Sequence, residues 1–202
     1  YWIIDCIYFK RKTIMGMGQK DLLMLDDALD KNGLRCLIGS ESSRKFPSSE
    51  EMNDLRQRNE KVDYNILELG SENLKPFERK KSVEYFKKIG ISCESLDIVN
   101  DEFITYNLDY QSDVTKVINK KYDMITNFGT TEHIHWQYPV WRNTHNLLKP
   151  GGYFIFTLPP YDCWPNHCNL FYSESFFWYL SKSNDYEIIQ LSRWTSGQSL
   201  PI

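Results

Sequence analysis

From residue 64 onward, short apolar runs alternate with segments that carry apolar residues at helical spacing. Strands are predicted at Tyr64–Leu69, Ser92–Ile98, Phe103–Leu108, Tyr122–Phe128, Tyr153–Leu158 and Tyr186–Leu191. Helices are predicted at Glu78–Ile89, Pro139–Leu148 and Ser173–Ser183. Strands that alternate with helices are typical of βαβ units. The pattern therefore predicts an α/β fold in which a mostly parallel sheet carries helices on both faces.

The front of the chain has a different character. Tyr1–Phe9 reads as a short buried helix, and Thr13–Gly18 reads as a strand that ends in a glycine turn. Gly39–Glu60 is polar and of mixed charge, which is typical of a loop followed by an exposed helix. We therefore predict that residues 1–62 form a helical or irregular extension or cap, and that residues 63–202 form the α/β domain.

Charge and cysteine usage limit the partners and the compartment. Lys and Arg number 24 against 27 Asp and Glu, so the net charge is −3 and no basic field is available to hold nucleic acid. The five cysteines are dispersed without a CxxC pair, which favours free thiols in the cytoplasm. The apolar stretch Tyr1–Phe9 contains Asp5 and is shorter than the ~20 residues of a membrane span. We expect a cytoplasmic protein that binds neither nucleic acid nor membranes.

Polar residues and glycines follow the predicted strands at the point where each strand ends. Gly70 follows the first strand, Asp97 closes the second and Asp109 follows the third. The carboxyl ends of parallel strands form the ligand-binding edge of an open α/β sheet. A glycine there lets the backbone approach a bound nucleoside, and an acid can accept both ribose hydroxyl groups. This pairing indicates a cofactor of the adenosine type.

The glycine content argues against a dinucleotide. A pyrophosphate site needs G-x-G-x-x-G at the turn, whereas this turn contains Gly70 alone. Glu72 also lies where the pyrophosphate would be, and its charge disfavours an anion. A cofactor without phosphate fits better, and a nicotinamide-type oxidoreductase is kept as a weaker alternative.

Four motifs in order then carry a family resemblance. They are Asn65–Gly70, Ser95–Asp97, Tyr122–His133 and Asn146–Gly152, the last being followed by a strand and Pro159. This series resembles the class I S-adenosylmethionine-dependent methyltransferases, over roughly residues 63 to 191. The later segment Pro165–Phe177 resembles a lid and helix of the branch that modifies small molecules and sugars. The resemblance implies a Rossmann-like methyltransferase fold with S-adenosylmethionine as its cofactor.

The resemblance also implies roles for residues at the strand ends. The implied cofactor-binding set is Glu68, Gly70, Ser71, Asp97, Ile98, Leu108, Asp109, Asn127, Phe128 and Gly129. In this reading Gly70 passes beneath the methionine part, and Asp97 binds the ribose hydroxyl groups. Ile98 stacks on the adenine, while Asp109 with Leu108 lies near its amino group. The stretch Ser71–Asn73 departs from the family's glycine-rich run.

Methyl transfer needs little acid–base machinery, because the sulfonium already activates the methyl group. A base need only take a proton from the acceptor. His167 and His133 are the candidate catalytic bases, with Glu132 as an orienting group. No histidine pair has a metal-ligand spacing such as H-x-x-x-H, and Cys163, His167 and Cys168 lack an evident fourth ligand, so no metal is predicted.

Several alternatives stay open in the sequence. Gly16 and Gly18 could form the cofactor turn in place of Gly70. A non-catalytic protein that retains the fold, either a pseudo-enzyme or an interaction subunit, is the alternative to an enzyme. The antiparallel seventh strand usual in this fold is predicted to be missing, because few residues follow Leu191. DNA methyltransferases that modify amino groups have a tetrapeptide of the Asn-Pro-Pro-Tyr type after the fourth strand. The Leu-Pro-Pro-Tyr sequence at Leu158–Tyr161 follows the fifth predicted strand instead. By elimination, the acceptor is expected to be a small molecule or sugar.

Overall fold

The computed structural model describes residues 5–11, 65–71, 73–74, 80–88, 91–159, 166–195 and 198–201. Its strands are β1 (Asp5–Arg11), β2 (Asn65–Leu69), β3 (Asn73–Leu74), β4 (Lys80–Lys81), β5 (Ser92–Asp97), β6 (Tyr106–Asn107), β7 (Tyr122–Phe128), β8 (Leu148–Leu158), β9 (Tyr186–Thr195) and β10 (Gln198–Pro201). Its helices are α3 (Ser82–Lys88), η2 (Val114–Lys116), η3 (Thr131–His133), α4 (Gln137–Leu147) and α5 (Glu174–Asn184).

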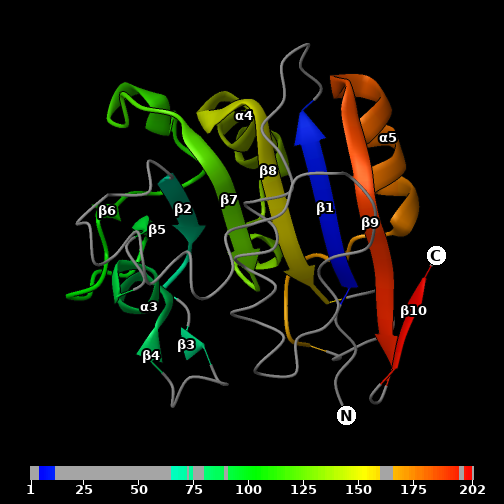
Figure 1. Ribbon diagram of the computed structural model, residues 1–202, viewed down its shortest axis with the longest axis horizontal. Coiled ribbons are helices and arrows are strands. Elements are labelled where there is room, and N and C mark those ends of the chain that lie inside the picture. Colours follow the sequence, from blue (N-terminus) through cyan, green and yellow to red (C-terminus); the bar gives the residue numbers. More distant parts are fainter. Residues whose placement is uncertain are drawn as a thin grey trace, which may run out of the picture.

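Eight of these strands form one sheet in the order β10-β9-β1-β8-β7-β2-β5-β6 (Figure 1). The five strands from β8 to β6 run parallel to one another. β3 and β4 form a separate small antiparallel pair. The predicted α/β fold with a mostly parallel sheet is therefore confirmed.

The predicted helix at Tyr1–Phe9 is wrong. Residues 5–11 form β1, which lies between β8 and β9 and is antiparallel to both. Periodicity alone cannot separate a short apolar run in a helix from one in a central strand. Residues 5–11 form a strand because β8 and β9 lie on either side of them, and pairing with both satisfies the backbone hydrogen-bond donors and acceptors of β1.

The prediction that the antiparallel strand of this fold is missing is also wrong, because β1 is antiparallel to its neighbours. We expected such a strand only after Leu191, but β1 comes from the front of the chain and enters the sheet beside β8. A second antiparallel strand, β10, pairs with β9. The strand predicted at Thr13–Gly18, the alternative turn at Gly16 and Gly18, and the polar stretch Gly39–Glu60 lie outside the described residues.

Apolar side chains pack on both faces of the sheet. One cluster includes Leu67, Leu69, Ile125, Phe154 and Phe156, and it extends to Val140 and Leu147 of α4 and to Phe177 of α5. The alternate strand residues Ile66, Met124 and Ile155 are equally buried but lie outside that cluster, as are Val83 and Phe86 of α3. Because strand side chains alternate between faces, α3 and α4 cover opposite sides of the sheet.

The order of the strands determines where a ligand can bind. From β2 the chain passes through α3 to β5 on one side, and from β7 it passes through α4 to β8 on the other. The two connections therefore diverge between β2 and β7, and ligands of such sheets bind at the carboxyl ends of the strands at this point. Among the described residues, none of the helices has the length and apolar character required to cross a membrane.

Candidate functional site

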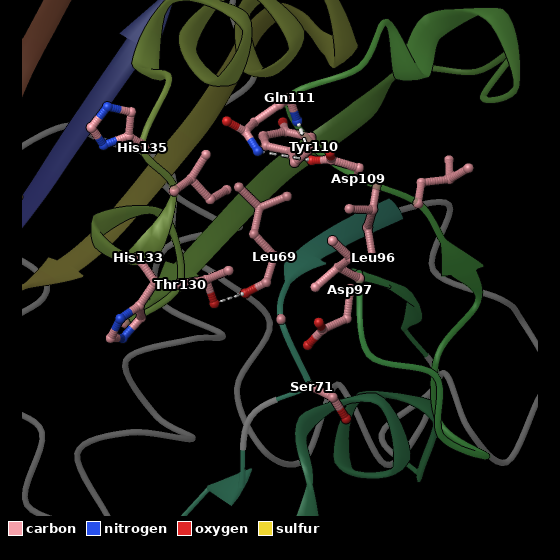
Figure 2. A pocket seen from close by; sticks show the side chains of 15 residues that line it. Leu69, Ser71, Leu96, Asp97, Asp109, Tyr110, Gln111, Thr130, His133 and His135 are labelled. Atoms are coloured by element: carbon pink, nitrogen blue, oxygen red, sulfur yellow. Dashed lines mark hydrogen bonds between the residues drawn. The ribbon is translucent and has the colours of Figure 1, made fainter. Parts of the chain in front are cut away.

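A cavity of about 480 Å³ opens at the carboxyl ends of β2, β5 and β7. Figure 2 shows Thr130 and His133 on one side of it and Asp97 and Ser71 on the other. It is lined by Leu69, Gly70, Ser71, Leu96, Asp97, Ile98, Leu108, Asp109, Tyr110, Gln111, Gly129, Thr130, His133, Ile134 and His135. Eight of the twelve predicted site residues are in this set: Gly70, Ser71, Asp97, Ile98, Leu108, Asp109, Gly129 and His133.

The turn after β2 requires glycine at position 70. Gly70 has φ +94°, and an added Cβ would lie 2.4 Å from Thr130 Oγ1. The Thr130 hydroxyl itself donates to the carbonyl of Leu69 at 2.8 Å (Figure 2). The amide of Gly70 donates to the carbonyl of Leu96 on β5 at 2.8 Å. A bare backbone at residue 70 is therefore built into the wall of the cavity.

Asp97 ends β5 with one carboxylate oxygen engaged. Its Oδ1 accepts a hydrogen bond from the amide of Val99 at 2.9 Å, and the described residues provide Oδ2 with no partner. Asn107 fixes the end of β5, because its Nδ2 donates to the carbonyls of Asp97 and Ile98 at 3.1 and 2.9 Å. The carboxylate is thus fixed at the cavity with acceptor capacity left for a ligand.

The residues that follow β6 complete this side of the cavity. The amide of Leu108 donates to the carbonyl of Asp97 at 3.1 Å. Asp109 is exposed, and its Oδ1 accepts from the amide of Gln111 at 2.8 Å. Leu96 and Tyr110 are buried and supply an apolar floor, whereas Ile98 is 67% exposed at the rim.

The hydroxyl of Ser71 is committed to other protein groups. It donates to Asp101 Oδ2 at 3.1 Å and accepts from Lys81 Nζ at 2.8 Å. Lys81 also donates to the Ser71 carbonyl at 2.7 Å and lies 3.5 Å from Asp101. This network positions the chain just after Gly70 without leaving the serine side chain free to move.

Four predicted residues do not line the cavity: Glu68, Asn127, Phe128 and His167. Glu68 is buried on the α3 side of the sheet, where it accepts a hydrogen bond from the hydroxyl of Ser82. Asn127 is buried and shapes the turn after β7, because its Oδ1 accepts from the amides of Thr130 and Thr131 at 3.1 and 3.2 Å. These two residues support the site from behind it.

A second group of candidate functional side chains lies beside the cavity. His133 Nε2 and His167 Nε2 lie 3.9 and 4.0 Å from Oε1 of Glu132, whose side chain is 1% exposed. The two imidazole rings meet edge to face, with centroids 4.9 Å apart and planes at 74°. Burial, and secondarily the charge of His167, lowers the pKa of His133. The lowered pKa favours the neutral form of His133.

Hydrogen bonds join the two chain segments that carry these histidines. The amides of Asn169 and Leu170 both donate to the carbonyl of Glu132 at 3.1 Å. The side chain of Asn169 donates to the carbonyl of His133 at 2.6 Å. The segment that follows β8 is thus fixed against η3, which brings His167 to the site.

The sequence did not identify several lining residues: Leu69, Leu96, Tyr110, Gln111, Thr130, Ile134 and His135. Most are direct neighbours of predicted residues, so the strand-end rule could have included them. Gln111 and His135 are the exceptions, since each lies two positions from a predicted residue.

The known proteins to which the chain is similar are methyltransferases. No curated protein matches the chain in sequence. A solved structure that is similar, the crystal structure of the glycopeptide N-methyltransferase MtfA, has 12% sequence identity and a TM-score of 0.37. That match covers 56% of this chain and 54% of the other, so the chain corresponds to about half of that protein's length. A family model described as a methyltransferase domain matches residues 44–198. The chain therefore belongs to the family of methyltransferase-domain proteins.

Proposed function

We propose that the protein transfers a methyl group from S-adenosylmethionine to a small-molecule or sugar-type acceptor. The observation that carries the proposal is the juxtaposition of the Gly70 turn and the Asp97 carboxylate at one cavity. The cavity volume of about 480 Å³ is within the range of small-molecule sites. Membership of the methyltransferase-domain family supports the reaction class.

The lining residues are suited to this cofactor. The bare backbone at Gly70 accommodates a group that a Cβ would exclude. Asp97 Oδ2 can accept the hydroxyl hydrogens of a ribose, and Leu96, Leu108 and Ile134 offer apolar contact to an adenine. Asp109 lies at the same end, where it can accept from an exocyclic amino group. No dense set of amides or cations for a pyrophosphate is found among the lining residues.

In the proposed reaction the protein acts mainly by positioning. S-adenosylmethionine supplies an electrophilic methyl group on its sulfonium. Gly129, Thr130 and His133 line the cavity and would position the acceptor nucleophile there, and such positioning is worth up to about 7–11 kcal/mol. His133 or His167 takes the proton that the acceptor loses, and the buried carboxylate of Glu132 orients the pair.

The proposed acceptor follows from the size of the cavity and the net charge of the chain. A cavity of this volume is within the range of small-molecule sites, which favours an acceptor of metabolite or sugar size. The net charge of −3 favours neither nucleic acid nor an anionic surface. The free thiols of Cys93 and Cys168 agree with a reducing compartment, and we propose the cytoplasm.

Calorimetric titration with S-adenosylmethionine tests the proposal. We expect one binding site per chain in the micromolar range, and no comparable heat from NAD. Heat from NAD but not from S-adenosylmethionine would replace the methyltransferase by an oxidoreductase. An absence of binding even at millimolar S-adenosylmethionine would replace it by the non-catalytic alternative.

A further inference from the structure

We propose that Glu132, His133 and His167 form a binding site for one divalent transition-metal ion of the Zn²⁺ class. The first two residues belong to η3, and His167 comes from the segment that follows β8. One ligand atom from each residue lies within 4.8 Å of the other two. Two imidazoles and one carboxylate are a donor set that suits zinc, iron, cobalt and nickel and disfavours magnesium and calcium.

The separations are those of ligands around a shared ion. Both imidazole Nε2 atoms face the same oxygen, Glu132 Oε1, at 3.9 and 4.0 Å. These distances are too long for hydrogen bonds. A triangle with sides no longer than 4.8 Å has a point within about 2.8 Å of all three atoms, and zinc–ligand bonds are about 2.0–2.2 Å. Shifts of less than about 1 Å would close the site on a metal.

The surrounding backbone is built to keep the three side chains together. Asn169 and Leu170 donate three hydrogen bonds to the carbonyls of Glu132 and His133, which ties the segment carrying His167 to η3. The rings of His133 and His167 are inclined at 74°, so the two rings are not stacked against each other. An added Cβ at Gly129 would lie 3.3 Å from Glu132 Oε1. The absence of a side chain at residue 129 therefore leaves space beside the carboxylate.

The site would be open on the side of the cavity. His133 lines the cavity together with Gly129 and Thr130 (Figure 2), whereas the Glu132 side chain is buried behind them. Three protein ligands and an open position are the arrangement of a catalytic rather than a structural metal site. A hydroxyl or carboxylate oxygen of the methyl acceptor could take the open position. This part of the inference depends on the proposed function.

A bound metal would change the roles of the histidines. Their Nε2 atoms would be ligands, and the ion would lower the pKa of a coordinated acceptor hydroxyl. The general-base role given above then belongs to the metal-free protein only. The acceptor class narrows to compounds with an oxygen donor that can reach the ion.

Titration of the chelator-treated full chain with Zn²⁺ alone tests the site. We expect one equivalent to bind in the micromolar range or tighter. His133→Ala and His167→Ala should each weaken binding by at least about tenfold. His135→Ala is the matched control, because this exposed histidine lies two positions from His133 and outside the cluster, and it should bind Zn²⁺ as the wild type does.

Co²⁺ absorption gives a second readout that does not depend on heat. Bound Co²⁺ should give visible ligand-field bands in the wild type and in His135→Ala, and none in His167→Ala. Equal binding by the wild type and both cluster variants would overturn the site, as would no binding to the wild type. Because neither titration contains S-adenosylmethionine, their outcome is separate from that of the cofactor test.

Discussion

The imidazole of His167 stands edge-on to that of His133, with ring centroids 4.9 Å apart. Both rings face the buried carboxylate of Glu132 in η3, beside the cavity that Gly70 and Asp97 line. The two functional parts of the site therefore share one edge of the sheet. One part is suited to a nucleoside cofactor, and the other to the proton or the metal that an acceptor needs.

Replacing Asp97 should affect cofactor affinity without unfolding the protein. Asp97→Ala removes a carboxylate with a free acceptor oxygen at the cavity, and loss of a hydrogen bond to a charged group costs about 1.5–3 kcal/mol. We expect the dissociation constant for S-adenosylmethionine to rise by about 10- to 150-fold. Glu102→Ala is the control, since Glu102 is exposed and does not line the cavity. Equal affinity in both variants would contradict the role of Asp97.

Replacing Gly70 should disturb both stability and binding. In Gly70→Ala the new Cβ meets Thr130 Oγ1 at 2.4 Å while the backbone keeps φ +94°. We expect a loss of about 1–3 kcal/mol in the free energy of unfolding, measured by urea denaturation. Adding Thr130→Ala removes the steric part but not the backbone part, so the double variant should recover some of the stability that the clash removes. If Gly70→Ala were as stable as the wild type, the turn would not have the described geometry.

The pairing of β1 can be tested through its backbone. Ile7 pairs with Phe156 of β8 on one side and with Leu191 of β9 on the other. Ile7→Pro removes a donor from a strand with neighbours on both sides and should cost about 3 kcal/mol or more. Ile7→Val keeps the backbone donor and a β-branched side chain, and it is the matched control. Thermal denaturation that is unchanged by Ile7→Pro would place residues 5–11 outside the sheet.

The thiol of Cys93 should be protected from alkylation. Burial, followed by the charges of Glu68 and Glu94, raises its pKa well above the ordinary value. A raised pKa keeps the thiol protonated in the folded state, while the unfolded thiol ionises as the pH rises through its ordinary range. At pH 8.5 iodoacetamide should modify Cys93 only after denaturation, as read by mass spectrometry of its peptide. The same linkage predicts that stability falls as the pH rises beyond the ordinary thiol pKa.

Much of the sheet could be predicted from local pattern. The predicted strand Tyr122–Phe128 coincides with β7, because this short segment contains four apolar or aromatic residues and is bounded by two lysines and by Gly129. The position of β1 could not be predicted in this way. Its place depends on the edges that β8 and β9 offer, and these lie far from it in the sequence.

The cavity could also be predicted from local pattern, whereas the histidine cluster could not. Gly70, Asp97 and Asp109 follow from the rule that ligands bind at strand ends. The proximity of His167 to Glu132 and His133 depends on hydrogen bonds from Asn169 and Leu170 to η3, which no spacing in the sequence reveals. Glu68 shows the opposite case, since its side chain alternates to the α3 face and away from the cavity.

A crystal structure of the chain with S-adenosylmethionine tests the central claim most directly. We predict that the cofactor occupies the cavity with a ribose hydroxyl within about 3.2 Å of Asp97 Oδ2. Its methionine part should pass over Gly70, and its methyl group should face the side of the cavity that carries His133. Electron density for the cofactor away from this cavity, or a cavity left empty in crystals grown at saturating cofactor, would contradict the claim.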